Sequence, residues 1–377
     1  MKPDILADLN FRALLQASGI PILRDEPPAF FGSLQQQLPL GNGIFAPIPA
    51  GAAEEVETSV GSLTFTWAAV TTTPSLQRLQ LVGKTLLRQL VLRLSGTWDQ
   101  SGGAESQATE GNPVLIQEVR LNCDGRVIRA KPGAVLYEEN RLMFRGAGPK
   151  TDPATGNGTG KAFSCTVFFD MGFLDLDHAD GRETPYLDLS QYANVFLEVQ
   201  MAPFNAYCSG NTQANMTATL AVSTLEIIGP RRLPQLHYEM LLAQSVDMTT
   251  TGTNRKVPLP RTNLVLRGLL LRVGTLAATP RVTAITALTN VGVQGKLNAG
   301  ALVVPKEKQA VALYQNQVGA FRSGISLTAG YLWIDFASNR KPEGLLRGNA
   351  YSGLDLVFDS AATASTTMEV YAACLTR

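Results

Sequence analysis

One short pattern occurs twice in this chain, and it strongly limits the folds that the sequence can adopt. Residues 88–97 read Arg-Gln-Leu-Val-Leu-Arg-Leu-Ser-Gly-Thr, and residues 267–275 read Arg-Gly-Leu-Leu-Leu-Arg-Val-Gly-Thr, so that Ser95 is the one gap between them. Both copies alternate in a way that suits a β-strand whose two faces meet different surroundings. The pattern therefore predicts two equivalent strands far apart in the sequence.

Two further pairs of segments follow the repeat in the same order. Residues 192–199 and 351–358 share a tyrosine, a small residue and alternating apolar positions, and residues 217–227 and 366–375 both read as strands. Any one of these matches is also expected by chance, because leucine, valine and arginine are common residues. Three matches in one order favour duplication of a whole β-domain.

The length of 377 residues allows two domains that each bury a core. We expect a helix and arm over residues 1–55, a first domain over 56–229 and a second domain over 230–377. The linker is placed at residues 230–234, which two prolines bracket. Many short strands separated by Gly-, Pro- and Asn-rich loops are typical of antiparallel sandwiches or barrels.

Helical periodicity is convincing only near the N-terminus. Residues 3–17 predict a short helix, because Pro3 suits a first turn and apolar residues recur at helical spacing up to Gly19. The charges of this helix nearly cancel, whereas helices that bind a membrane surface are usually basic. Packing against protein is therefore favoured. Repeated prolines over residues 20–55 predict an extended arm, which is either a disordered tail or a strap between subunits.

Composition narrows the class of protein. Charged residues are 17% of the chain, against about 25% in typical soluble proteins, which indicates a surface that largely contacts neighbours. The net charge of +1 produces no overall field that would attract nucleic acid. No secretory signal or transmembrane helix is expected, since Asp4 and Asp8 interrupt the apolar N-terminus and apolar runs are short. The four cysteines lack metal-site spacing, so buried thiols are expected.

Motifs that would support catalysis or cation binding are weak. Residues 156–161 are rich in glycine before a lysine, but they lack the first glycine and the hydroxyl residue of a phosphate-binding loop. Asp175, Asp177 and Asp180 partly follow a calcium loop, but Leu187 stands where that loop needs a glutamate. A solvated acidic turn is favoured there, with adventitious divalent-cation binding as the alternative. We expect no catalytic residue, no cofactor and no enzyme activity.

Taken together, these features resemble those of the double jelly-roll major capsid proteins of tailless icosahedral viruses, many of which enclose a membrane. The likeness covers residues 56–377. Its carriers are the paired strands 86–97 and 264–275, the hairpin 116–128 with Asp-Gly in its turn, and residues 192–199 with 351–358. The resemblance implies an all-β fold of two tandem eight-stranded jelly-roll barrels, with a short N-terminal helix and an extended arm.

The resemblance also implies a function. The protein would be a structural capsid protein that forms homotrimers, and these pseudo-hexagonal capsomers would tile an icosahedral virion assembled in the host cytoplasm. Its partners would be neighbouring capsomers and other capsid proteins, without recognition of specific nucleic-acid sequences. The loops 99–112, 146–160 and 175–186 would form the outer surface. The N-terminus would lie on the inner side and contact neighbours or the viral membrane through Ile5, Leu6, Leu9 and Phe11.

Two other functions compete with this interpretation. A viral spike, host-attachment or glycan-binding protein built from tandem β-sandwiches would expose a cluster of aromatic side chains. A polysaccharide hydrolase would need two carboxylates facing each other in a cleft, about 5–9 Å apart. The sequence contains no feature that selects either of them.

Overall fold

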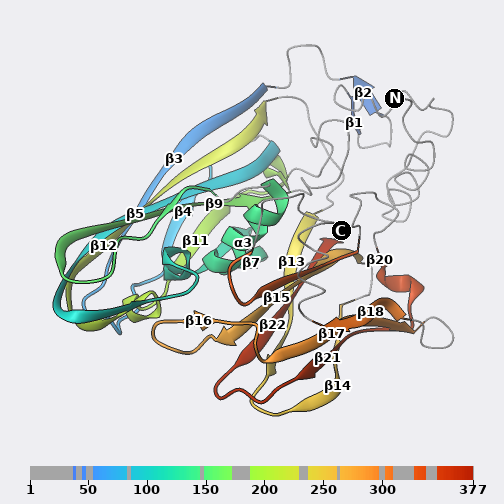
Figure 1. Cartoon of the computed structure of the whole chain (residues 1–377). Helices are drawn as coiled ribbons and strands as arrows, with labels where there is room; N and C mark the ends of the chain where they lie inside the picture. The colour runs from blue at the N-terminus through green and yellow to red at the C-terminus, as the bar shows by residue number, and fades with distance from the viewer. Residues whose placement is uncertain are drawn as a thin grey trace, which may run out of the picture.

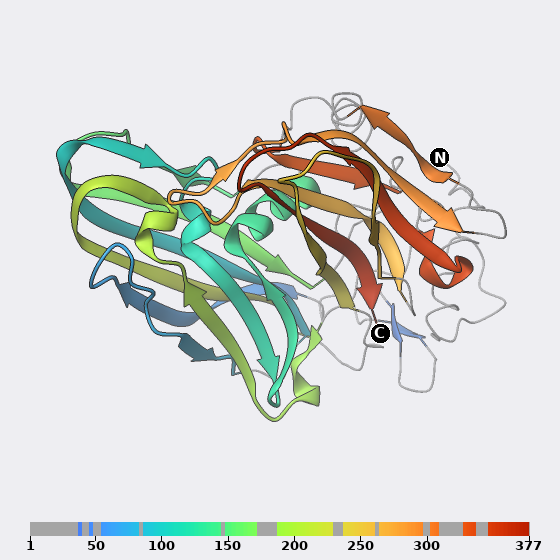
Figure 2. The ribbon, with the colours of Figure 1, turned by 90° about the horizontal axis from the view of Figure 1, so that it is seen from below.

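A computed structural model shows the chain as a mainly β-structure. It describes residues 37–39, 45–47, 54–82, 86–144, 148–171, 187–228, 237–260, 264–296, 302–308, 327–336 and 346–376. We call residues 54–228 the first half and residues 237–376 the second half. Figures 1 and 2 show the sheets of the two halves side by side. Two short strands, β1 (Gln37–Pro39) and β2 (Phe45–Pro47), pair with each other.

The first half consists of two antiparallel sheets. The six-stranded sheet has the order β3-β12-β5-β9-β8, with β10 paired to β5. Its strands are β3 (Glu54–Thr66), β5 (Leu86–Gln107), β8 (Lys150–Thr151), β9 (Gly158–Asp170), β10 (Leu187–Asp188) and β12 (Cys208–Ile228). The four-stranded sheet has the order β4-β11-β6-β7, with strands β4 (Gln77–Gln80), β6 (Ile116–Cys123), β7 (Arg126–Lys131) and β11 (Val195–Met201).

The second half repeats this arrangement. Its six-stranded sheet has the order β13-β22-β15-β16, with β19 and β20 also paired to β15. Its strands are β13 (His237–Asp247), β15 (Val265–Thr275), β16 (Val282–Thr283), β19 (Tyr331–Asp335), β20 (Leu346–Arg347) and β22 (Thr367–Thr376). The four-stranded sheet has the order β14-β21-β17-β18, with strands β14 (Gly252–Pro258), β17 (Leu288–Lys296), β18 (Leu302–Lys308) and β21 (Gly353–Ser360).

The three segment pairs predicted from the sequence are confirmed as topological counterparts. They fall on β5 and β15, on β11 and β21, and on β12 and β22, which hold matching places in the two strand orders. An irregularity in the strand pairing is also repeated. The register between β5 and β12 shifts at Arg88, and the register between β15 and β22 shifts at Arg267. The predicted linker lies outside the described residues, so the domain boundaries stay predictions.

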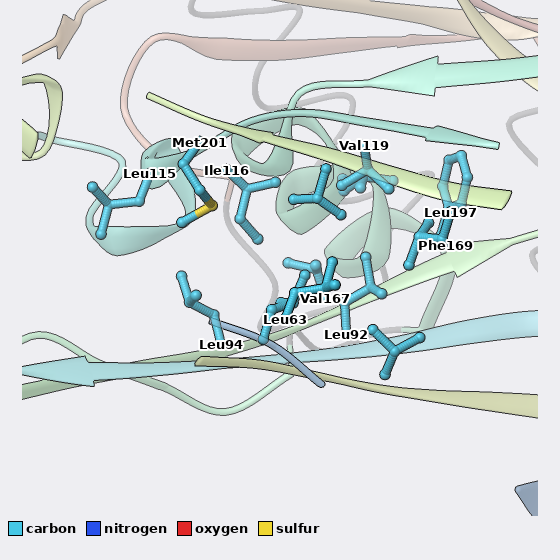
Figure 3. Packing of buried hydrophobic residues seen from close by; sticks show 14 of the residues in the cluster. Leu63, Leu92, Leu94, Leu115, Ile116, Val119, Val167, Phe169, Leu197 and Met201 are labelled. Atoms are coloured by element: carbon cyan, nitrogen blue, oxygen red, sulfur yellow. The ribbon is translucent and has the colours of Figure 1, made fainter. Parts of the chain in front are cut away.

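Alternation of side chains explains the two cores. In β5, Leu92 and Leu94 are buried on one face while Arg93 and Ser95 are exposed on the other, as a strand between core and solvent requires. Figure 3 shows side chains from the two sheets of the first half, such as Leu92 and Val119, meeting in the space between them. Each large apolar side chain buried in this way contributes about 1.5–3 kcal/mol. A separate cluster forms the core of the second half.

The predicted hairpin is confirmed. Strands β6 and β7 pair across Asp124 and Gly125, which have φ angles of 50° and 82°. Two consecutive positive φ angles are the requirement of a type I′ turn, and Asp-Gly is among the few sequences that meet it easily.

One predicted loop is wrong, because β5 continues to Gln107 through most of the polar segment 99–112. Its polar end pairs with β12 up to Cys208. The Glu105 side chain is fully buried, and it accepts hydrogen bonds from Lys161 and from Gln107, the latter at 2.8 Å. A strand can therefore be polar where its side chains find partners.

The sequence also missed a helix. Helix α3 (Gly133–Phe144) follows β7, and the described 3-10 helices are η2 (Asn112–Leu115), η3 (Leu189–Gln191), η4 (Phe204–Ala206) and η7 (Gly348–Ala350). In the part of the chain that is described, no helix has the length and apolar character needed to cross a membrane. Several predicted features lie outside the described residues: the helix 3–17, Ile5, Leu6, Leu9, Phe11, Asp175, Asp177 and Asp180.

Candidate functional site: the buried junction between the two halves

A buried cluster of polar side chains joins the two halves. Arg272 of β15 donates from Nε to Oε1 of Glu110 at 2.8 Å and from a terminal nitrogen to Oε2 at 2.7 Å. Both side chains are only 3% exposed. Two parallel hydrogen bonds between a guanidinium and a carboxylate form a strong and directional ion pair. Glu110 belongs to the first half and Arg272 to the second, so the pair fixes one half against the other.

Two tyrosines and a second carboxylate complete the cluster. Arg272 also donates to Glu369 of β22 at 3.0 Å. The hydroxyl of Tyr331 donates to Glu110, and the hydroxyl of Tyr371 donates to Glu369 at 2.8 Å. Burial raises the pKa of both tyrosines, which keeps them protonated as donors.

The groups around Arg272 keep its guanidinium positively charged. Burial alone would lower the pKa of Arg272, but the charges of Glu110 and Glu369 and the hydrogen bonds to Glu110 outweigh burial and raise it. Burial, followed by repulsion from Arg272, instead lowers the pKa of Arg281. Arg272 is therefore the cation around which the carboxylates are arranged, with its charge compensated by Glu110 and Glu369.

Backbone hydrogen bonds support the same junction. The N–H of Arg281 donates to the carbonyl oxygen of Ala206 at 3.0 Å, and the carbonyl oxygen of Arg281 accepts from the N–H of Thr109 at 3.2 Å. A segment of the second half is thus inserted between two segments of the first half. Such contacts satisfy backbone groups that burial would otherwise leave unpaired.

Helix α3 makes a second polar contact with the other half. The carboxylate of Glu138 accepts from the N–H of Thr328 at 3.0 Å and from the hydroxyl of Thr328. Arg141 donates to the Thr328 hydroxyl oxygen at 3.1 Å. Burial raises the pKa of Glu138, although Arg141 and Thr328 oppose this rise. Figure 1 shows α3 on the side of the first half that faces β15.

The repeat provides a counterpart of this site that has no such role. Arg93 holds the position in β5 that Arg272 holds in β15. Arg93 pairs with Glu57 at 2.7 Å, and the two side chains are 47% and 45% exposed. Exposed ion pairs of this kind contribute about 0–1 kcal/mol. The difference between the two arginines therefore comes from what covers them and not from the fold.

The sequence analysis named none of the residues of this junction as site residues. Glu110 lies at the end of the predicted polar loop 99–112. The only sequence signal at Arg272 is that a charged residue stands within an apolar strand. Among the described residues no group of three or more histidine, cysteine or acidic side chains is arranged to hold a metal ion. The four cysteines are free and buried, as expected. In the junction, Arg272 is paired with both Glu110 and Glu369, so the arrangement is suited to holding two domains together.

Comparison with known proteins identifies the fold. No protein-family model matches the sequence, and no curated protein is similar to it. Among solved structures, a chain of Sulfolobus Turreted Icosahedral Virus is similar over 86% of this chain and 91% of that chain, with 14% identity and a TM-score of 0.65. A chain of the PBCV-1 virus capsid matches over 86% and 95%, with 13% identity and a TM-score of 0.61.

The major capsid protein of bacteriophage PM2 is also similar, over 85% of this chain and 97% of that chain, with 12% identity and a TM-score of 0.50. At these identities the likeness defines the fold. The chain has the double jelly-roll fold of these capsid proteins, which confirms both the predicted fold class and the resemblance inferred from the sequence.

Proposed function

We propose that the chain is the major structural subunit of an icosahedral virion, and that it acts by assembly and without enzymatic activity. The observation that carries this proposal is the junction around Arg272, because it joins two barrels of the same topology into one unit. The side surfaces of such a two-barrel unit are available for contacts with neighbouring subunits.

Three such chains would form a capsomer. Closed cyclic symmetry of three copies would present six barrels around one axis and a nearly hexagonal outline, which tiles a curved shell. Permanent interfaces of this kind bury roughly 2,000–5,000 Å² or more. The low charged fraction of 17% is consistent with so much surface being covered.

The remaining expectations belong to the same proposal. The two barrels would span residues 56–229 and 230–377, and residues 1–55 would reach neighbouring subunits or a viral membrane on the inner side. Ile5, Leu6, Leu9 and Phe11 are the proposed contact residues there. Assembly would take place in the host cytoplasm, together with other capsid proteins.

The mass of the purified protein in solution tests this proposal. Light scattering coupled to size-exclusion chromatography should give a trimer of about 120 kDa, three times the chain mass of 40.4 kDa, or larger assemblies. Electron microscopy of the same sample should show particles with a hexagonal outline. A monomer that binds glycans would overturn the proposal and support an attachment protein.

A further inference from the structure

Strand β3 forms an open edge of the six-stranded sheet in the first half. It pairs with β12 on one side, and within the described residues no strand pairs with its other side. Figures 1 and 2 show β3 along the side of the first half that lies away from the second half. An edge of this kind presents backbone N–H and C=O groups to which a strand of another chain can bind.

Other edge strands carry features that disfavour such pairing. Strand β13, the counterpart of β3, has a register shift in the middle of its pairing with β22, between Leu242 and Gln244. Strand β8 consists of two residues only. Charged residues and prolines occur in three further edge strands, namely Arg126, Arg129 and Lys131 in β7, Arg255, Lys256 and Pro258 in β14, and Pro305, Lys306 and Lys308 in β18. Short strands, irregularities, charges and prolines all protect a sheet edge from added strands.

The second part of β3 has none of these features. Its one irregularity, at Val60, precedes residues 61–66, which pair with β12 in an unbroken register. These residues read Gly-Ser-Leu-Thr-Phe-Thr and carry no charge. Their outward-facing side chains, Ser62, Thr64 and Thr66, are short and exposed. Another strand can therefore approach this part of the edge without meeting a charge or a bulky group.

The backbone groups of the same three residues point toward the open side. The N–H of Trp67 donates to the carbonyl oxygen of Met216 at 3.1 Å, so the backbone groups of Trp67 point toward β12. Successive residues of an antiparallel strand alternate in this direction. The N–H and C=O groups of Ser62, Thr64 and Thr66 therefore point away from β12.

We infer that residues 61–66 pair with the same residues of a second copy, in antiparallel orientation around a two-fold axis at Thr64. The inference rests on the proposed capsid function and supplies a contact for it. A two-fold contact is isologous and closes with two copies, so it cannot belong to a ring of three. It would join one capsomer to the next.

The occupant follows from the segment itself, which is complementary to a second copy. Pairing centred on Thr64 places Ser62 opposite Thr66 of the second copy, so that hydroxyl side chains meet on the outer side. It places Leu63 opposite Phe65 of the second copy on the inner side, where both side chains are buried in their own core. The pair exchanges about six hydrogen bonds, two at each pair of opposite residues whose backbone groups face the axis.

Disulfide formation at the proposed axis tests the inference. The four native cysteines are buried, so Thr64→Cys introduces a single exposed thiol. Opposite residues of an antiparallel pair have Cα atoms about 4.5–5.5 Å apart, which a disulfide can span. Under mild oxidation this variant should form covalent dimers of chains. The native mass should rise to about 240 kDa or more, six times the chain mass of 40.4 kDa, as two linked trimers require.

The matched control is Thr219→Cys. Thr219 of β12 lies directly opposite Thr64 in the register of the sheet. Two copies of Thr219 would be separated by three strand spacings, or about 14 Å, which is too far for a disulfide. This variant should form few covalent dimers. Equal cross-linking of the two variants, or no cross-linking of Thr64→Cys, would overturn the inference.

A backbone substitution gives an independent test. Thr64→Pro removes an N–H on the open side and leaves the bonds to β12 in place, a position at which edge strands tolerate proline. It should weaken association between trimers about 10-fold or more, because each contact loses two hydrogen bonds. Thr64→Val keeps the N–H and a β-branched side chain, and it should associate like wild type. Light scattering over a concentration series measures the association, and thermal unfolding checks that each variant is folded.

The outcomes separate the inference from the proposed function. A trimeric wild type in which Thr64→Cys links one trimer to another supports the inference. If Thr64→Cys links chains only within a trimer, so that the native mass does not rise, the inference is overturned and the capsid proposal still holds. A monomeric wild type overturns the proposed function, and the contact between capsomers with it.

Discussion

The junction around Arg272 allows a quantitative test, because the repeat supplies its own control. Substitution Arg272→Met removes the guanidinium and keeps much of the apolar volume of the side chain. It leaves Glu110 without its ion-pair partner at 3% exposure, and Glu369 loses a bond at 3.0 Å. Removing one member of a buried pair costs about 3–5 kcal/mol, since the remaining charge is uncompensated. We expect a loss of that size in the free energy of unfolding.

The matched substitution is Arg93→Met in the first half. Its ion pair with Glu57 is nearly half exposed, so the expected loss is about 0–1 kcal/mol. Urea unfolding followed by tryptophan fluorescence measures both variants, with Trp67 and Trp98 in the first half and Trp333 in the second. The reasoning is refuted if Arg272→Met destabilises the protein no more than Arg93→Met does.

Three further predictions concern titration, thiol reactivity and a turn. The raised pKa of Glu138 means that its contribution to stability is fully present below its ordinary pKa of 4.5 and is lost as pH rises through the higher folded value. Wild type should therefore lose stability relative to Glu138→Gln in urea titrations between pH 4 and pH 8, and a pH-independent difference would contradict this. Burial raises the pKa of Cys123 and Cys208 to about 12, so a thiol reagent at pH 8 should modify no cysteine of the native protein and four after denaturation. Gly125→Ala should lower the free energy of unfolding, measured by thermal unfolding, by about 1 kcal/mol, because φ at this position is 82°. Gly148→Ala is the comparison, because Gly148 has no positive φ and a Cβ at this position would instead meet Thr166.

Local alternation explains why so much of the fold could be predicted from the sequence. Leu92 and Leu94 bury one face of β5 whatever lies on the other face, and the same holds for Leu269 and Leu271 in β15. The Asp124-Gly125 turn is likewise specified by its own backbone angles. Features of this kind depend on residues that are close in the sequence.

Features that depend on distant partners could not be predicted. Helix α3 escaped notice because its buried residues include polar ones, such as Glu138, Glu139 and Asn140. Glu139 is paired with Lys131 at 2.7 Å, and Asn140 with the backbone of Phe168, so no simple apolar period marks the helix. The junction is a more extreme case, because Glu110 and Arg272 meet only once both barrels have formed.

Arg272 and Arg93 hold the same position in the two halves, and the comparison shows what burying an ion pair costs. Desolvating Arg272 and Glu110 costs several kcal/mol per ion before their attraction offsets it. The covalent tether makes their encounter intramolecular, with an effective concentration that separate chains do not reach. On the first half the matching positions are Arg93, Thr166 and Ala221, and the ion pair of Arg93 with Glu57 stays nearly half exposed to water. The buried ion pair of Arg272 therefore fits a permanent contact within one chain, whereas the exposed pair of Arg93 contributes little to holding the two halves together.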